Sequence, residues 1–122
     1  MEHIALISGA DTSSDNKENV TIMTCHAAKG LEYPVVFLVA FEEDVLPSFF
    51  ATRDEKSGKP KGIEEERRLC YVAITRAKEQ LYLTSAKFRM IQGNCLNPAA
   101  SRFYREIPTE LLRGNLELGM FC

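Results

Sequence analysis

The segment at residues 20–40 reads VTIMTCHAAKGLEYPVVFLVA, and its apolar pattern decides the predicted fold. Residues 20–24 are strand-like. Residues 34–40 form a continuous, largely β-branched run typical of a strand buried on both faces, as in a parallel sheet. The loop between the two runs carries charged groups and Gly30. The segment therefore predicts two strands joined by a loop that holds charged side chains at the end of a rigid element.

A second segment, at residues 64–77, reads EEERRLCYVAITRA and predicts a helix. We expect this helix to span residues 63–78. Glu64 precedes Arg67 and Arg68 by three and four positions, which is the favourable acid-first order for ion pairs on one helix face.

The second half of this predicted helix, residues 69–77, is apolar nearly all round, so we expect it to be buried between layers. Tyr71 is then expected in the core, and Arg76 at the end of the helix. Residues 80–84 predict a further strand. This order of elements favours an α/β fold with a parallel sheet.

The remaining chain predicts connecting segments and short helices. Residues 1–9 predict the last turns of a helix, and the polar residues 10–19 predict a linker. Residues 42–44, Glu-Glu-Asp, are expected to lie solvated in a turn after the strand. Residues 47–62 predict a long surface loop, because they contain Pro, Gly, Lys, Asp and Ser. Residues 101–106 predict a short helix capped by its first serine.

The composition sets the broad class. A chain of 122 residues with 45% hydrophobic and 26% charged residues is ordinary for one globular domain or part of one. The formal net charge of −2 does not suggest an autonomous nucleic-acid binder.

No apolar run approaches a membrane span and no signal peptide is recognisable, so we expect a cytoplasmic protein without membrane contact. The four cysteines form no close pair, so no metal site is expected, and Cys25 and Cys70 are interpreted as core residues.

The two segments together resemble motifs V and VI of the UvrD/PcrA/Rep group of superfamily 1 DNA helicases. The first motif is matched at Thr24, His26, Ala28, Lys29, Gly30, Leu31, Glu32 and Tyr33. The second is matched at Glu65, Glu66, Arg67, Arg68, Leu69, Tyr71, Val72, Thr75, Arg76 and Ala77. Two long motifs in the correct order are a far more specific signal than one short pattern.

The resemblance implies a partial RecA-like sheet of the P-loop NTPase type, parallel and flanked by helices. Residues 1–19 would then be the end of an accessory-domain helix and its linker. Residues 20–112 would be the C-terminal half of the second RecA-like motor domain, and residues 113–122 a C-terminal tail.

The resemblance also implies the site residues. Arg76 would be the catalytic arginine finger that reaches the γ-phosphate, the alternative being a surface arginine in the last helical turn. Gly30 and Glu32 would join it at the nucleotide, the alternative for Glu32 being an acid paired with a nearby Arg or Lys. Single-stranded DNA would meet Thr24, His26 and Lys29 through its backbone, although Lys29 could instead lie near the nucleotide, and His26 could instead be buried.

The sequence contains no Gly-x-x-x-x-Gly-Lys-Ser/Thr loop and no Asp-Glu pair after a strand. The resemblance therefore implies a parent enzyme that uses ATP and Mg²⁺, whereas this chain alone should bind neither and be inactive. The implied partners are single-stranded or partially duplex DNA and the N-terminal motor domain of the same parent. The leading interpretation is an ATP-dependent 3'-5' DNA helicase. The alternatives are a RecB/AddA-like helicase–nuclease, an RNA helicase of the same superfamily, and a non-enzymatic module that binds DNA or a partner.

Overall fold

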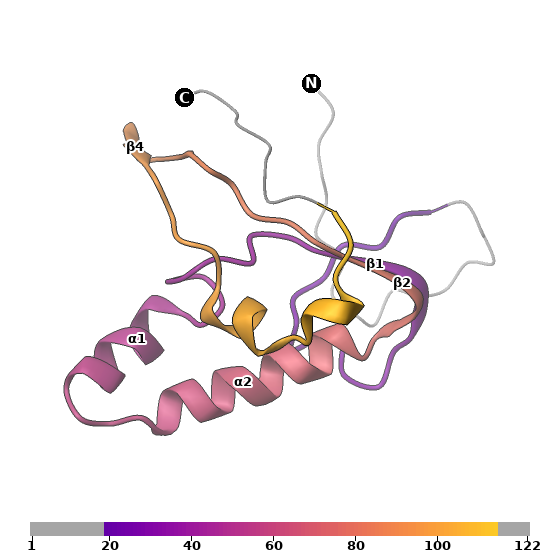
Figure 1. Cartoon of the computed structure of the whole chain (residues 1–122), viewed down its shortest axis with the longest axis horizontal. Helices are drawn as coiled ribbons and strands as arrows, with labels where there is room; N and C mark the ends of the chain where they lie inside the picture. Colours follow the sequence, from indigo (N-terminus) through magenta and orange to yellow (C-terminus); the bar gives the residue numbers. More distant parts are fainter. Residues whose placement is uncertain (1–18, 115–122) are drawn as a thin grey trace.

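The computed structural model describes residues 19–114, which form a small α/β unit (Figure 1). Its elements follow one another as β1 (Tyr33–Leu38), α1 (Phe49–Lys56), α2 (Lys61–Ile74), β2 (Ala77–Leu83), β3 (Arg89–Ile91), β4 (Asn94–Leu96) and the 3-10 helices η1 (Arg102–Glu106) and η2 (Thr109–Leu111). The helix predicted at residues 1–9 lies outside the described residues, as does nearly all of the predicted linker. None of the helices within residues 19–114 has the length and apolar character needed to cross a membrane.

Strands β1 and β2 pair in parallel, which confirms the predicted α/β class with a parallel sheet. Leu38 pairs with Leu83 and Val36 with Leu81. Leu38, Leu81 and Leu83 face the core, and α2 packs against both strands. The helices α1 and α2 form an antiparallel pair (Figure 1). In the part of the chain that the structure describes, the parallel sheet has two strands.

The opposite face of this sheet is apolar and exposed. Val35, Phe37 and Val39 are 43%, 62% and 66% exposed, and Tyr82 stacks on Phe37 with ring centroids 4.6 Å apart. The prediction that residues 34–40 are buried on both faces is therefore wrong for this unit. The reason is that nothing among residues 19–114 forms a second layer over that face, although a parallel sheet usually has one.

The predicted strand at residues 20–24 is also absent from the described structure. Val20 is 91% exposed and Ile22 is 51% exposed. A strand is held by hydrogen bonds to a neighbour, and no described segment pairs with these residues. The β propensity of Val, Thr and Ile is not sufficient by itself.

The prediction that residues 47–62 form a loop is wrong, and one predicted helix boundary is moved. Residues 47–62 contain helix α1, whose N-cap Ser48 accepts a hydrogen bond from the Ala51 N–H at 3.4 Å. Helix α2 ends at Ile74 rather than at residue 78. The Tyr33 N–H donates to the Arg76 carbonyl at 2.9 Å, so the pairing with β1 takes the chain out of the helix and into β2.

The core lies between the sheet and α2. Its buried members are Leu38, Phe41, Leu46, Ala51, Ile63, Cys70, Ala73 and Phe103. The prediction of a core residue is confirmed for Cys70, and burial raises the pKa of its thiol to about 11. Cys25 is partly buried and packs against the cluster from outside it. Tyr71, in contrast, is 70% exposed, so its predicted place in the core is wrong. It lies on the face of α2 opposite to Ala73 and Cys70, which are buried.

The acidic turn after β1 is the largest departure from the sequence prediction. Glu42 is completely buried, and its carboxylate accepts hydrogen bonds from Arg89 at 2.7 and 2.9 Å and from the Ala86 N–H at 2.6 Å. Glu43 pairs with Arg102 at 2.9 Å. These partners lie 44 to 59 positions further along the chain, so the local composition cannot reveal them. Arg89 and Arg102 thereby fix the segments that follow β2 against the end of β1.

The predicted helix at residues 101–106 is confirmed as the 3-10 helix η1, and Ser101 caps it by accepting from the Phe103 N–H at 3.3 Å. The ion pair predicted between Glu64 and Arg67 is also present. Arg67 pairs in addition with Glu106 at 2.9 Å, which ties α2 to η1.

Candidate functional site

Residues 24–32 form a compact turn, which we call the 24–32 turn, directly before β1. The Thr24 side chain accepts a hydrogen bond from the Ala27 N–H at 3.2 Å, and the Thr24 carbonyl accepts from Ala28 at 3.2 Å. The Leu31 N–H then donates to the Ala28 carbonyl at 3.0 Å. A threonine hydroxyl that caps its own following turn is a common local device. Thr24 therefore stabilises the turn that presents the other candidate residues.

Gly30 gives this turn its shape. Its φ angle is +82°, in the region that residues with a Cβ rarely adopt. A Cβ placed there would meet no atom within 4 Å, so close approach by another part of the described chain is not the reason for glycine. The open space beside Gly30 leaves its backbone accessible from outside.

Arg76 lies in the tight connection between α2 and β2, and its side chain joins the two motif segments. Its Nη1 donates to the Leu31 carbonyl at 3.0 Å, its Nε donates to the Val72 carbonyl at 2.9 Å, and its Nη2 donates to Thr75 Oγ1 at 3.1 Å. Leu31 stands between Gly30 and Glu32, so Arg76 is fixed directly against the 24–32 turn. Arg76 was expected at the end of the helix, but α2 ends at Ile74, so Arg76 lies two residues beyond it.

The bonding of Arg76 leaves part of its guanidinium available. A guanidinium has five N–H donors, and one donor on each nitrogen is used. One N–H on Nη1 and one on Nη2 are thus left, and no carboxylate among the described residues pairs with Arg76. Two N–H groups in a planar fork match the oxygens of a phosphate. The two remaining N–H groups can therefore donate to an anionic oxygen.

The remaining predicted residues lie on the surface of the same turn. Glu32, Lys29 and His26 are exposed, which excludes the alternative that His26 is buried. Neither Glu32 nor Lys29 makes an ion pair within residues 19–114, so the alternative of a locally paired Glu32 finds no partner there. Gly30 and Glu32, which flank Leu31, thereby lie with Arg76 at the end of the β1–β2 pair where both strands begin, whereas His26 lies at a pocket formed with α1 and α2.

A pocket that the sequence does not predict adjoins His26. It has a volume of about 260 Å³ and is lined by His26, Ser48, Phe50, Ala51, Asp54, Gly62, Glu65, Glu66 and Leu69. We call it the His26 pocket. Ser48 donates to Glu66 Oε1 at 3.0 Å across its wall, joining the start of α1 to α2. The interpretation of residues 47–62 as a loop concealed this pocket, although Ser48 is a recognisable N-cap signal.

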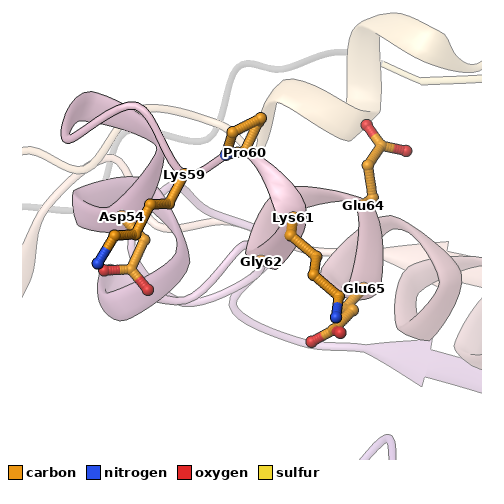
Figure 2. A pocket seen from close by; sticks show the side chains of 7 residues that line it. All are labelled: Asp54, Lys59, Pro60, Lys61, Gly62, Glu64 and Glu65. Carbon is orange, nitrogen blue, oxygen red and sulfur yellow. The ribbon is translucent and has the colours of Figure 1, made fainter.

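A second, more open hollow of about 650 Å³ continues from it along the ends of α1 and α2. Figure 2 shows acids and lysines interspersed around this hollow. Its lining residues are Asp54, Lys59, Pro60, Lys61, Gly62, Glu64 and Glu65. The two helices lie close together here, since a Cβ at Gly62 would be in contact with Ala51 at 3.4 Å. The mixed signs of charge give this hollow no preference for an anion or a cation.

Comparison with known proteins assigns a family. Residues 1–88 match the family model described as the UvrD-like helicase C-terminal domain. The chain is similar to the ATP-dependent DNA helicase PcrA of Staphylococcus epidermidis, with 46% identity over 109 residues, which are 89% of this chain and 14% of that protein. It is 44% identical to the protein of the same name from Staphylococcus aureus over 112 residues, 92% of this chain and 15% of that protein. The chain thus spans about one seventh of the length of these relatives.

Proposed function

The chain belongs to the family of UvrD-like helicase C-terminal domains, and from this premise we propose that it forms part of the second motor domain of an ATP-dependent 3'-5' DNA helicase. In this proposal residues 20–112 are the C-terminal half of a RecA-like domain, residues 1–19 end an accessory domain, and residues 113–122 are a tail. The parent protein is cytoplasmic and acts on single-stranded and partially duplex DNA.

The observation that carries the proposal is the contact between Arg76 and Leu31. It holds the two motif segments together at 3.0 Å although they are 45 positions apart, and it orients the free N–H groups of the guanidinium. Phosphoryl transfer is catalysed mainly by positioning and by stabilisation of developing charge. The Arg76 guanidinium is positively charged and is held by hydrogen bonds to both motif segments, so it is suited to that role.

The residues around Arg76 then divide into two sets. Gly30 and Glu32 contact the nucleotide beside Arg76, since an exposed carboxylate accepts hydrogen bonds from ribose hydroxyls. Thr24, His26 and Lys29 contact single-stranded DNA from the other part of the turn. The described residues contain no group of three His, Cys, Asp or Glu that could hold a metal ion. The proposal therefore assigns Mg²⁺ and the phosphate-binding loop to the N-terminal motor domain of the parent, which closes on Arg76 when ATP is bound.

A chimaeric protein tests the proposed function. The 109 matching residues of this chain would replace their counterparts in the S. epidermidis helicase. We expect the chimaera to retain DNA-stimulated phosphate release and strand unwinding, because the segment supplies the same motifs in the same order. The isolated 122-residue chain, assayed beside it, is expected to release no phosphate with or without DNA, because it lacks a phosphate-binding loop.

The control is a chimaera with the matching segment deleted, which should be inactive. A folded chimaera, shown by a sharp thermal transition, that neither hydrolyses ATP nor unwinds DNA would count against the proposal. Phosphate release that scales with the concentration of the purified isolated chain would show that the site is complete in this chain and would overturn the partial-motor interpretation.

Lys29→Ala in the full-length protein is expected to weaken single-stranded DNA binding to the same extent for every base sequence. Lys29 is exposed and makes no ion pair within residues 19–114, and a lysine that meets a phosphate carries no sequence information. The loss of one phosphate contact should lower the slope of log affinity against log salt by about 0.7. Titrations by fluorescence anisotropy at several salt concentrations measure this slope.

Lys56→Ala is the matched control, because Lys56 is an exposed lysine at the end of α1, distant in sequence from the 24–32 turn. It should leave the slope unchanged. If Lys29→Ala left DNA binding intact and instead raised the KM for ATP, the alternative position of Lys29 beside the nucleotide would be correct.

A further inference from the structure

The His26 pocket combines an exposed aromatic ring, that of Phe50, with a candidate DNA-contacting residue, His26. It lies where the 24–32 turn, the start of α1 and the first half of α2 meet. The Ser48–Glu66 hydrogen bond closes one side of it. Its ligand can be inferred from the chemistry of its walls.

The polar wall accepts hydrogen bonds and repels anions. It carries the carboxylates of Asp54, Glu65 and Glu66 and no lysine or arginine. Glu66 already accepts a bond from Ser48, whereas Asp54 and Glu65 have no side-chain partner within residues 19–114. Asp54 and Glu65 also line the adjoining hollow with Lys59 and Lys61, but the His26 pocket itself is lined by acids alone among charged side chains, so it favours an uncharged ligand over a DNA phosphate. Such a wall can bind N–H donors, and in DNA these are the uncharged N–H groups of the bases.

The apolar wall is flat and open. Phe50 is 74% exposed and stands at the pocket, and Leu69 and Ala51 supply further apolar surface. Phe49, the adjacent residue, contacts Phe50 edge-on with ring centroids 6.0 Å apart but does not line the pocket. The imidazole of His26 is a second planar group on the same pocket. Bases of single-stranded nucleic acids stack on exposed aromatic rings in this way.

We propose that the His26 pocket binds one nucleobase of single-stranded DNA, stacked against Phe50 and His26, with an exocyclic amine donating to Glu65 or Asp54. The inference rests on the proposed function in one respect, since it takes single-stranded DNA as the ligand. It refines the role of His26, which contacts a base of the DNA, while Thr24 and Lys29 contact the DNA backbone. Cytosine and adenine carry an exocyclic amine, whereas the one ring N–H donor of thymine is flanked by two carbonyl oxygens that face the carboxylates unfavourably.

The test compares DNA strands of equal length in the full-length protein. The strands are oligo(dA), oligo(dC), oligo(dT) and an abasic strand with the same phosphates, and the variants are Phe50→Ala and Glu65→Gln. We expect the wild type to bind oligo(dA) and oligo(dC) more tightly than oligo(dT). Phe50→Ala should lower the affinity for oligo(dA) and oligo(dC) by about tenfold and leave the abasic strand unchanged. Glu65→Gln, which keeps the shape of the pocket, should reduce the preference over oligo(dT).

Phe49→Ala is the matched control, because it removes an exposed neighbouring ring from outside the pocket, and it should change none of the affinities. Phe50 is largely exposed, so its replacement should not unfold the protein, which a thermal melt checks. Equal affinity of the wild type for the three base-containing strands, or an equal loss on all strands in Phe50→Ala, would overturn the base pocket while leaving the proposed DNA binding intact. A wild type that bound none of the strands would overturn the proposed function itself.

Discussion

Replacing Arg76 with alanine in the full-length protein is expected to lower ATP turnover by about a hundredfold or more, with single-stranded DNA affinity largely retained. The reason lies in the two free N–H groups of the guanidinium, which would neutralise charge developing on the transferred phosphoryl group. The backbone of Arg76 is fixed by the Tyr33 N–H at 2.9 Å, and its side chain by Val72, Thr75 and Leu31. A donor held this firmly needs no reorganisation at the moment of reaction.

Arg76 also has a structural contact, so the experiment must separate the two roles. Arg76→Lys retains the charge and one possible bond to the Leu31 carbonyl, but a lysine cannot reproduce the planar fork. It should therefore be nearly as inactive as Arg76→Ala. Added guanidinium ion should restore part of the turnover of Arg76→Ala if the missing group acts on the phosphate, whereas a distorted 24–32 turn would not be rescued.

Single-turnover hydrolysis with saturating DNA measures the step in which the effect should appear, because a transition-state contact lowers kcat more than it changes binding. Arg105→Ala is the matched control, since Arg105 is an exposed arginine of η1 with no ion-pair partner within residues 19–114. A hydrolysis step within a factor of two of the wild type in Arg76→Ala would make Arg76 a purely structural residue and remove the main support for the proposed function.

Local patterns were sufficient to predict the parts of the fold that depend on short-range chemistry. The β-branched run before Ala40 and the apolar face of α2 predicted a parallel α/β unit, and the Ser101 cap predicted η1. The positive φ angle of Gly30 was also predictable, because glycine is the residue that adopts it without strain. The strand and helix propensities, the cap and the φ angle are each determined by residues within a few positions of one another, whereas the pairing of β1 with β2 is long-range.

The features that the sequence did not reveal depend on distant partners. Helix α2 gives way to β2 early because Tyr33, more than forty positions before, pairs with residue 77. Residues 20–24 have strand propensity, but no described neighbour pairs with them. Residues 42–44 were predicted to be solvated because their partners, Arg89 and Arg102, lie far along the chain.

In the candidate site, too, local residue types were predictable and long-range contacts were not. Arg76, Gly30 and Glu32 were identified as residue types in two motifs, and the structure places them at one end of the sheet. The acceptor that fixes Arg76 is a backbone carbonyl, that of Leu31, which no side-chain pattern can indicate. The His26 pocket requires α1, and the loop-like composition of residues 47–62 hid that helix. Its carboxylates come from two helices and converge only in the folded chain.

Arg89→Ala is expected to be among the most destabilising single substitutions in the described residues, with a loss of about 3 kcal/mol in the free energy of unfolding. The substitution leaves the Glu42 carboxylate, which is 0% exposed, without its charged partner. Arg89 itself is 34% exposed, so the lower end of the range for breaking a buried pair applies. Such a loss is a large fraction of the roughly 5–15 kcal/mol that stabilises a domain.

The reverse substitution should be milder. Glu42→Ala leaves Arg89, and its partly exposed guanidinium can turn into water, so the loss should be smaller than for Arg89→Ala. Arg53→Ala, the removal of an exposed arginine from α1, is the control and should change the stability by less than about 0.5 kcal/mol. Urea unfolding of the 122-residue chain and its variants gives the three differences. A larger loss in Glu42→Ala than in Arg89→Ala would contradict this account of which charge is trapped.

The pH dependence distinguishes a trapped charge from simple loss of packing. In the wild type, hydrogen bonds from Arg89 hold the pKa of Glu42 below its ordinary value. The pair therefore stabilises the protein above about pH 4.5, and this stabilisation is lost as the pH falls through the lower pKa of the folded state. In Arg89→Ala the isolated, buried carboxyl should have a raised pKa instead. Its destabilisation should then grow as the pH rises above about 4.5 and shrink in acid. Parallel stability–pH profiles of the wild type and Arg89→Ala would show that Arg89 acts through packing of its aliphatic stem and not through the charge of Glu42.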